Sequence, residues 1–190
     1  MTILTTARLT LRVPQVDDFD AVYTLSESPE MRRFLSNEAP SHADSFTWLL
    51  RNAGSWAFYG YGSFIVHDRT NGALIGTCGV FHSYRGLGED FDNRAEAGWI
   101  IAQSHWNQGY AREAMDAVLA WFDQTHGPEE IVAMVQEGNS VSEIVAQRLG
   151  FIAMRKAELK GAVMTLFRRM GRLAIFPNAP PKNHFSTHYG

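Results

Sequence analysis

The sequence has a single cysteine, no apolar run long enough to span a bilayer, and no large excess of either charge. Cys78 therefore has no second cysteine with which to form an internal disulfide. Threonines and an arginine stand where a secretory signal has its apolar run, so we expect a cytoplasmic protein without a membrane partner. A net charge of -3 offers no general field for phosphate backbones, and we expect no nucleic-acid partner.

The sequence does contain ample material for one core. It has 190 residues, of which 45% are hydrophobic, and this is enough for one sizeable domain but short for two. We expect a single domain over residues 1–170. The last stretch, 171–190, holds Pro177, Pro180 and Pro181 and has no apolar period, so it is expected to be irregular.

The first half of the chain is predicted to open with a strand and then become helical before it forms a hairpin. Alternating apolar residues indicate a strand over 9–13, and Asp17 or Asp18 is placed to cap a following helix. A short helix is expected to begin at Ser28-Pro29, and Phe46, Leu49, Leu50 and Ala53 have the spacing of a buried helical stripe. Asn71-Gly72 joins two predicted strands, 61–68 and 73–81.

The second half is predicted to hold two strand-then-helix units and a closing pair of strands. Buried strands are expected over 95–102 and 131–135, and a strong helical stripe runs from Ala111 to Phe122. Ser140 and Glu143 have the spacing of a capping box at the start of a helix that ends at Gly150. The closing strands are expected over 151–159 and 163–168.

The most informative segment is 96–114, in which a strand leads through a polar loop into a helix. Gly109 and Ala111 are small residues at the helix start, where a ligand can approach the backbone. Free N–H groups and the positive end of the helix dipole suit a pyrophosphate at this place. An ordinary strand-to-helix turn has the same spacing, because one Gly-x-Ala is far weaker than a full dinucleotide fingerprint.

This segment resembles motif A of the GNAT superfamily of N-acetyltransferases. The run from Trp106 to Ala114, Trp-Asn-Gln-Gly-Tyr-Ala-Arg-Glu-Ala, is similar to the branch that acetylates amino termini of ribosomal proteins. Other family marks follow in order over about residues 7–170: Arg8-Leu-Thr-Leu-Arg12, the strand with Gly76, Asn139-Ser-Val-Ser142, and Leu149-Gly150-Phe151. Trp106 departs from the Gln or Arg of the general pattern.

The resemblance implies an α/β (α+β) fold, with a mixed, twisted sheet of about six or seven strands flanked by helices. Acetyl-CoA is then the co-substrate and lies in a split between the strands at 95–102 and 131–135. Its pantetheine arm is expected to pair with backbone of Trp99, Ile100 and Ile101. Its pyrophosphate is expected at the N–H groups of Gln108, Gly109, Tyr110, Ala111 and Arg112, and Asn139 is expected to bind the pantetheine arm.

The implied reaction is attack of an uncharged amine on the thioester, and two residues are candidates for its proton transfers. Glu96 matches the position of a carboxylate that takes the amine proton directly or through water. An acidic residue at a strand end is as often an ion-pair partner. Ser142 matches the position whose hydroxyl protonates the CoA sulfur, and its alternative role is helix capping beside Ser140.

The acceptor is an amine, either a protein amino terminus or a small molecule such as an aminoglycoside, an amino acid or a polyamine. The loop at 84–93, with Glu89, Asp90 and Asp92, is a candidate recognition surface, although a solvated turn fits equally well. A catalytically silent acyl-CoA-binding module is the alternative function. The histidines lack metal-ligand spacing, so no metal is expected, and the sequence is compatible with a monomer or a homodimer.

Overall fold

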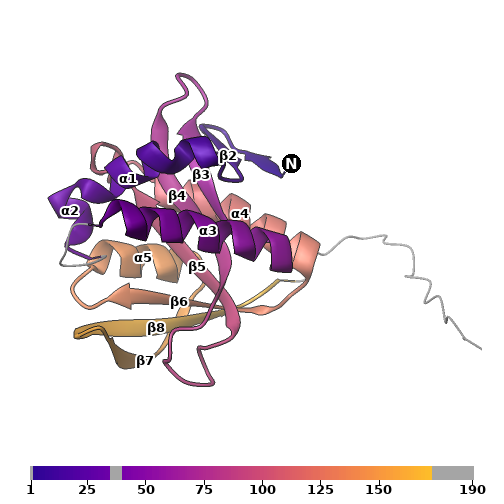
Figure 1. Cartoon of the computed structure of the whole chain (residues 1–190). Helices are drawn as coiled ribbons and strands as arrows, with labels where there is room; N and C mark the ends of the chain where they lie inside the picture. Colours follow the sequence, from indigo (N-terminus) through magenta and orange to yellow (C-terminus); the bar gives the residue numbers. More distant parts are fainter. Residues whose placement is uncertain (1, 35–39, 173–190) are drawn as a thin grey trace, which may run out of the picture.

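An eight-stranded sheet with the strand order β1-β2-β3-β4-β5-β6-β8-β7 forms the centre of the molecule in a computed structural model (Figure 1). The structure describes residues 2–34 and 40–172, so most of the tail predicted to be irregular lies outside it. All neighbouring strands run antiparallel except β5 and β6, which are parallel. The strands are β1 (Ile3–Thr5), β2 (Leu9–Arg12), β3 (Ser63–Asp68), β4 (Leu74–Ser83), β5 (Arg94–Ile101), β6 (Glu130–Gln136), β7 (Ile152–Leu159) and β8 (Ala162–Met170).

The predicted mixed sheet is confirmed, with one strand more than the sequence indicated. The additional strand, β1, is a three-residue edge strand whose side chains are half-buried or exposed. It carries no alternation of apolar and polar residues long enough to predict a strand.

Helices cover both faces of the sheet (Figure 1). Helices α1 (Phe19–Glu27) and α3 (His42–Tyr59) cross one face, which is here called the front. Helix α4 (Tyr110–His126) lies on the back, and α5 (Ser140–Arg148) packs beside it. Short helical turns complete the chain: η1 (Val16–Asp18), α2 (Pro29–Arg32) and η2 (Gln103–His105). Among the described residues, no helix is both long and apolar enough to cross a membrane.

Strand β5 lies between the two halves of the sheet and presents different residues to each face. Ala95, Ala97 and Ile101 are buried in the core that includes the apolar side of α4. Because side chains alternate along a strand, Glu96 and Ile100 point to the front face. Glu96 is therefore carried on the side covered by α1 and α3, opposite the main core.

A second, smaller core lies on the front of β6 and β8. It is built around Phe91, Val132 and Leu166, all fully buried. Phe91 belongs to the β4–β5 loop, so this half of the front face is covered by a loop instead of a helix. The front face thus has two separate covers, with β5 between them.

Helix α3 corrects the stripe predicted from Phe46, Leu49, Leu50 and Ala53. Leu49 is buried, but Phe46 and Leu50 are 52% and 56% exposed. The buried positions of α3 are instead largely polar, and Asn52 forms two hydrogen bonds with the backbone of Ser63, at 2.7 and 3.1 Å. This face of α3 binds strand backbone, which an apolar period does not reveal.

Candidate active site

Strands β5 and β6 pair over only two residues and then separate. Ala95 lies beside Ile131 and Glu96 beside Val132, and no later residue of β5 pairs with β6. The other side of β5 is paired with β4 along its whole length. The carboxyl-terminal half of β5 is therefore an internal sheet edge inside the molecule.

The direction of the backbone groups along this edge follows from the β4–β5 ladder. The N–H of Ala102 donates to the carbonyl of Ile75 at 2.8 Å, and in an antiparallel pair every second residue exchanges such bonds. Ile100 and Gly98 thus face β4, whereas Trp99 and Ile101 direct their backbone groups into the split. The carbonyl of Ile101 accepts a 2.6 Å hydrogen bond from Nε1 of Trp106.

Of the three residues predicted to pair with a pantetheine arm, Trp99 and Ile101 are thus oriented towards the split, and Ile100 is oriented towards β4. The Ile100 carbonyl is also close to Gly76 of β4. A Cβ on Gly76 would lie 2.0 Å from that oxygen, so only glycine permits β4 to approach β5 here.

The start of α4 lies directly after this edge. Gly109 is the residue before the helix, with φ at 79°, and the loop residue Asn107 also has a positive φ of 58°. The N–H groups of Tyr110, Ala111 and Arg112 lie in the first turn, where a helix offers no carbonyl partner. This arrangement collects unpaired N–H donors at the positive end of a 17-residue helix.

Arg8 fastens this loop to the beginning of β2. Its Nη1 donates to the carbonyl of Gln108 at 3.0 Å, and its Nε donates to Glu113 at 2.6 Å. Burial opposes ionisation of Glu113, but hydrogen bonds from Thr6 and Arg8 outweigh that effect and lower its pKa. The sequence marked Arg8 only as part of a family pattern, and the structure gives it this contact with the loop.

Arg112, predicted near a phosphate, is half-exposed and pairs with Asp116 on the next turn of α4 at 3.5 Å. That distance and exposure make a weak pair from which the guanidinium is easily released. A cavity of about 590 Å³ lies beyond the carboxyl end of β5 and is bounded by α1, by Leu74 at the start of β4, and by residues 102–104.

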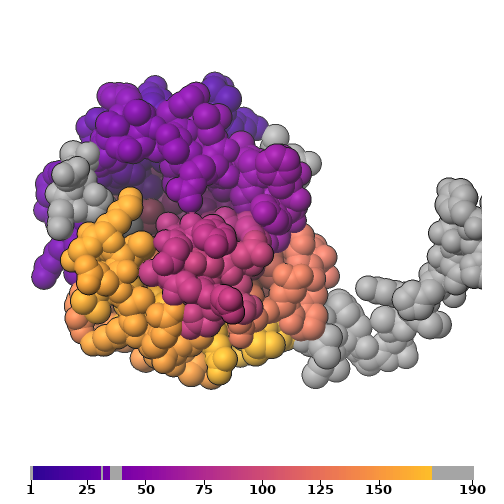
Figure 2. All heavy atoms as spheres, turned by 60° about the horizontal axis from the view of Figure 1, so that its bottom comes forward, coloured from indigo at the N-terminus to yellow at the C-terminus, as the bar shows by residue number. Residues whose placement is uncertain are grey.

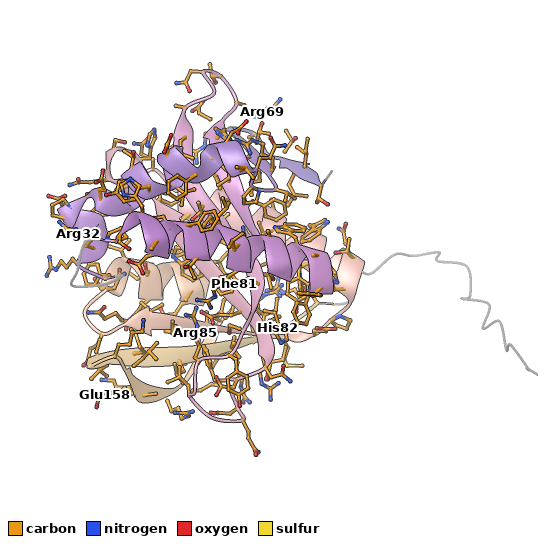
Figure 3. The ribbon with its side chains drawn as sticks, in the orientation of Figure 1. Arg32, Arg69, Phe81, His82, Arg85 and Glu158 are labelled. Atoms are coloured by element: carbon orange, nitrogen blue, oxygen red, sulfur yellow. The ribbon has the colours of Figure 1, made fainter. Side chains whose placement is uncertain are left out.

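A hollow on the front face separates its two covers. Figure 2 shows it between the purple helical segment and the magenta β4–β5 loop with the orange hairpin β7–β8. In Figure 3, Phe81 and Arg85 lie beneath α3 in this region. Glu96 lies on the front side of β5, between the two covers, and its side chain is almost fully buried.

Glu96 forms a two-pronged ion pair with Arg85. The Nε and Nη2 atoms of Arg85 donate to its two carboxylate oxygens, each at 2.8 Å. The Glu96 side chain is 3% exposed, and that of Arg85 is 24% exposed. No motif indicated Arg85, because it comes from the folded-back loop and does not lie opposite Glu96 in the strand ladder.

The start of α5 differs from the predicted capping box. Asn139, not Ser140, is the capping residue, and its Oδ1 accepts from the N–H of Ser142 at 3.2 Å. Gly138 turns the chain with φ at 88°, which moves the cap one residue earlier. The amide NH₂ of Asn139 and the hydroxyl of Ser142 have no partner among the described residues, so both groups can meet a ligand.

Cys78 is a core residue. It is 1% exposed, and burial raises the pKa of its thiol. A protonated, buried thiol is not a nucleophile. Within the described ranges, no three His, Cys, Asp or Glu side chains gather as a metal site.

Comparison with known proteins connects this geometry to one family. The family described as acetyltransferase (GNAT) domain matches residues 8–152. The uncharacterized N-acetyltransferase YnaD of Bacillus subtilis is 28% identical over 147 residues, which cover 77% of this chain and 81% of YnaD.

Solved structures agree. A Bordetella pertussis protein assigned to GNAT-family acetyltransferases has a TM-score of 0.82 and 30% identity, covering 89% of this chain and 99% of its own. RimL, a ribosomal L7/L12 α-N-protein acetyltransferase solved with coenzyme A, has a TM-score of 0.70 at 16% identity, covering 89% and 98%. The likeness to RimL is one of fold.

Proposed function

This chain belongs to the GNAT family and is an acetyl-CoA-dependent N-acetyltransferase, and we propose which of its residues bind the cofactor and which take part in catalysis. The amine attacks the thioester directly, with both substrates bound at once. Acetyl-CoA enters from the back of the split, and the amine enters from the front hollow. The two meet beside Glu96.

The cofactor-binding part of the proposal rests on two sets of backbone groups. Trp99 and Ile101 offer hydrogen bonds to the amide groups of the pantetheine arm, as an added strand would. The first-turn N–H groups of α4, with Gln108 and Gly109 before them, bind the pyrophosphate. Arg112 leaves Asp116 to add charge, and the Asn139 amide donates to the pantetheine.

The catalytic part assigns one residue to each side of the split. Glu96 on the front face receives a proton from the acceptor ammonium. Ser142, in the first turn of α5 on the back, donates to the departing sulfur. Each Glu96 oxygen accepts one hydrogen bond from Arg85 and keeps a second lone pair for the acceptor.

The acceptor is a primary amine, either a protein amino terminus or a small molecule. RimL is an α-N-protein acetyltransferase, and the fold likeness makes an amino terminus a candidate. The hollow on the front face is the entry for either class.

The observation that carries the proposal is the internal edge of β5 beside the free amino end of α4. Calorimetric titration with acetyl-CoA, and with adenine nucleotides for comparison, tests the cofactor assignment. Binding near micromolar, or about -8 kcal/mol, that depends on the pantetheine arm supports it. Absence of acetyl-CoA binding would refute it.

A thiol-release assay on a panel of amines then tests catalysis. Ser142→Ala should lower kcat by about tenfold or more without a large change in the KM for acetyl-CoA, since an acid acts at the departing sulfur. Ser140→Ala is the matched control on the same turn and should retain activity. Binding without thiol release for any amine would support the silent module instead.

A further inference from the structure

The ion pair between Glu96 and the partly exposed Arg85 has consequences for the acceptor. Both oxygens of Glu96 accept charge-assisted hydrogen bonds from the planar guanidinium of Arg85. Each oxygen keeps a second lone pair, so an acceptor ammonium can bind Glu96 beside Arg85. A plain cationic amine would, however, meet the positive charge of Arg85 before it reached Glu96.

Arg85 is held in place from several directions. Its own backbone N–H donates to Asp92 at 2.7 Å, and the N–H groups of Gly86 and Gly88 donate to the same carboxylate at 3.0 Å each. The buried Phe91 anchors this loop against the second core. The guanidinium carbon lies 5.9 Å from the centroid of the Phe81 ring. The loop therefore presents a preorganised guanidinium.

Arg85 also keeps unused binding capacity. Its Nε and Nη2 atoms bind Glu96, whereas its Nη1 has no hydrogen-bond partner within the part of the chain that the structure describes. The side chain is 24% exposed, so part of the guanidinium is accessible from the hollow. The neighbouring acids are already engaged, Asp92 by backbone N–H groups and Asp90 by Arg155 at 2.7 Å.

We infer that the acceptor is a zwitterion, a small amino acid or close analogue whose amine and carboxylate are separated by a few bonds. This inference rests on the proposed function. The acceptor carboxylate pairs with Arg85, and the acceptor ammonium pairs with Glu96. One Arg–Glu pair is thus exchanged for two, and neither buried charge is left alone.

The reaction then balances as follows. The ammonium gives one proton to Glu96, which passes it to solvent, and the nitrogen lone pair forms the new N–C bond. The C–S bond breaks, and its electrons leave on the CoA sulfur. In the proposed mechanism, the Ser142 hydroxyl donates a proton to that sulfur. The second proton of the nitrogen then replaces the proton that Ser142 gave up. The products are the N-acetylated acid, CoA thiol and one released proton.

The test compares acceptors that differ in one group. Thiol release is measured with an amino acid, its carboxamide, and the amine that lacks the carboxylate, together with a polyamine and a blocked-carboxyl peptide. In the unaltered protein, the amino acid should exceed its carboxamide in kcat/KM by roughly tenfold or more, the discrimination of one charged contact. Equal or better use of the carboxamide or the polyamine would overturn the inference and leave the N-acetyltransferase intact.

Variants separate this role from a structural one. Arg85→Met should abolish the preference for the free acid while the KM for acetyl-CoA stays unchanged, and Arg85→Lys should restore part of it through its charge. Arg51→Met, on the exposed side of α3, is the control and should keep the preference. If Arg85→Met fails to fold, Arg85→Lys alone tests the inference. An unchanged preference for the amino acid over its carboxamide, despite loss of the planar guanidinium, would contradict the inference. Absence of thiol release with every acceptor would overturn the proposed function and this inference together.

Discussion

The guanidinium carbon of Arg8 lies 4.2 Å from the centroid of the Tyr110 ring, so the residue before β2 is stacked on the first residue of α4. The same side chain binds the Gln108 carbonyl and Glu113. A residue more than a hundred positions earlier in the chain thereby fixes the loop proposed to bind the pyrophosphate.

Replacing this clamp should weaken acetyl-CoA binding. Arg8→Ala removes one charge-assisted hydrogen bond to the loop and one cation–π contact, together worth about 1–2 kcal/mol at a partly exposed site. The dissociation constant for acetyl-CoA should rise roughly 5- to 30-fold in calorimetric titration. Arg51→Ala serves as the control. An unchanged affinity in Arg8→Ala would show that the loop before α4 keeps its conformation without the contacts of Arg8.

Gly109→Ala should reduce both stability and cofactor binding. A left-handed conformation costs an alanine about 1–2 kcal/mol, and the methyl group would lie 3.7 Å from Nη2 of Arg8, which holds this loop. Gly161 has a similar φ of 76° in the β7–β8 turn and nothing within 4 Å of an added Cβ. Gly161→Ala should therefore lose similar stability in urea unfolding but keep its affinity for acetyl-CoA, and equal loss of affinity in both variants would contradict the assignment.

The free energy of unfolding should fall in acid partly through Asp18. Burial opposes its ionisation, but hydrogen bonds from Arg12 and from the N–H of Gln15 outweigh it and lower its pKa. A lowered folded-state pKa stabilises the protein above the unfolded value of about 3.9, and that contribution is lost as the pH falls through the folded value.

Urea unfolding between pH 7 and pH 3 measures this effect. At pH 7, Asp18→Asn should cost about 1.5–3 kcal/mol, because the charge-assisted bonds are removed. The difference between the two proteins should narrow as the pH drops below about 4. A difference that stays constant down to pH 3 would mean that Asp18 contributes only through its shape.

Asp123 and Arg169 form an ion pair whose side chains are 6% and 7% exposed. Asp123 also accepts from the backbone N–H of Arg172 at 3.1 Å, which fixes the end of β8 to α4. Asp123→Asn should leave a buried guanidinium without its counter-charge and destabilise the fold by about 3–5 kcal/mol in urea. The double replacement Asp123→Leu with Arg169→Met should recover a large part of that loss, and no recovery would point to a packing defect.

Local periodicity was sufficient for much of the fold. The stripe from Ala111 to Phe122 is confirmed as the buried side of α4, and the predicted mixed sheet is present. These features follow from burial of regularly spaced apolar residues, which a sequence displays directly. The family marks added the strand–loop–helix segment that the structure places at the split.

Side-chain pairing between distant segments was not predictable. Arg85 reaches Glu96 only because Asp92 and Phe91 fold the loop back over the sheet. The α3 stripe was wrong, since its buried side hydrogen-bonds strand backbone instead of packing on apolar residues. Asn139 and Ser140 are both good capping residues, and the backbone turn at Gly138 decides between them.

Because β5 pairs with β6 over two residues, the sheet consists of two halves that are joined at Ala95 and Glu96. The amide protons of Trp99 and Ile101, which point into the split, should exchange rapidly with solvent in the free protein. A bound pantetheine arm would supply their missing acceptors and join the half-sheets into one continuous ladder. The cofactor would then serve as a temporary ninth strand. Slower hydrogen exchange at the amides of Trp99 and Ile101 would show that it has bound along β5.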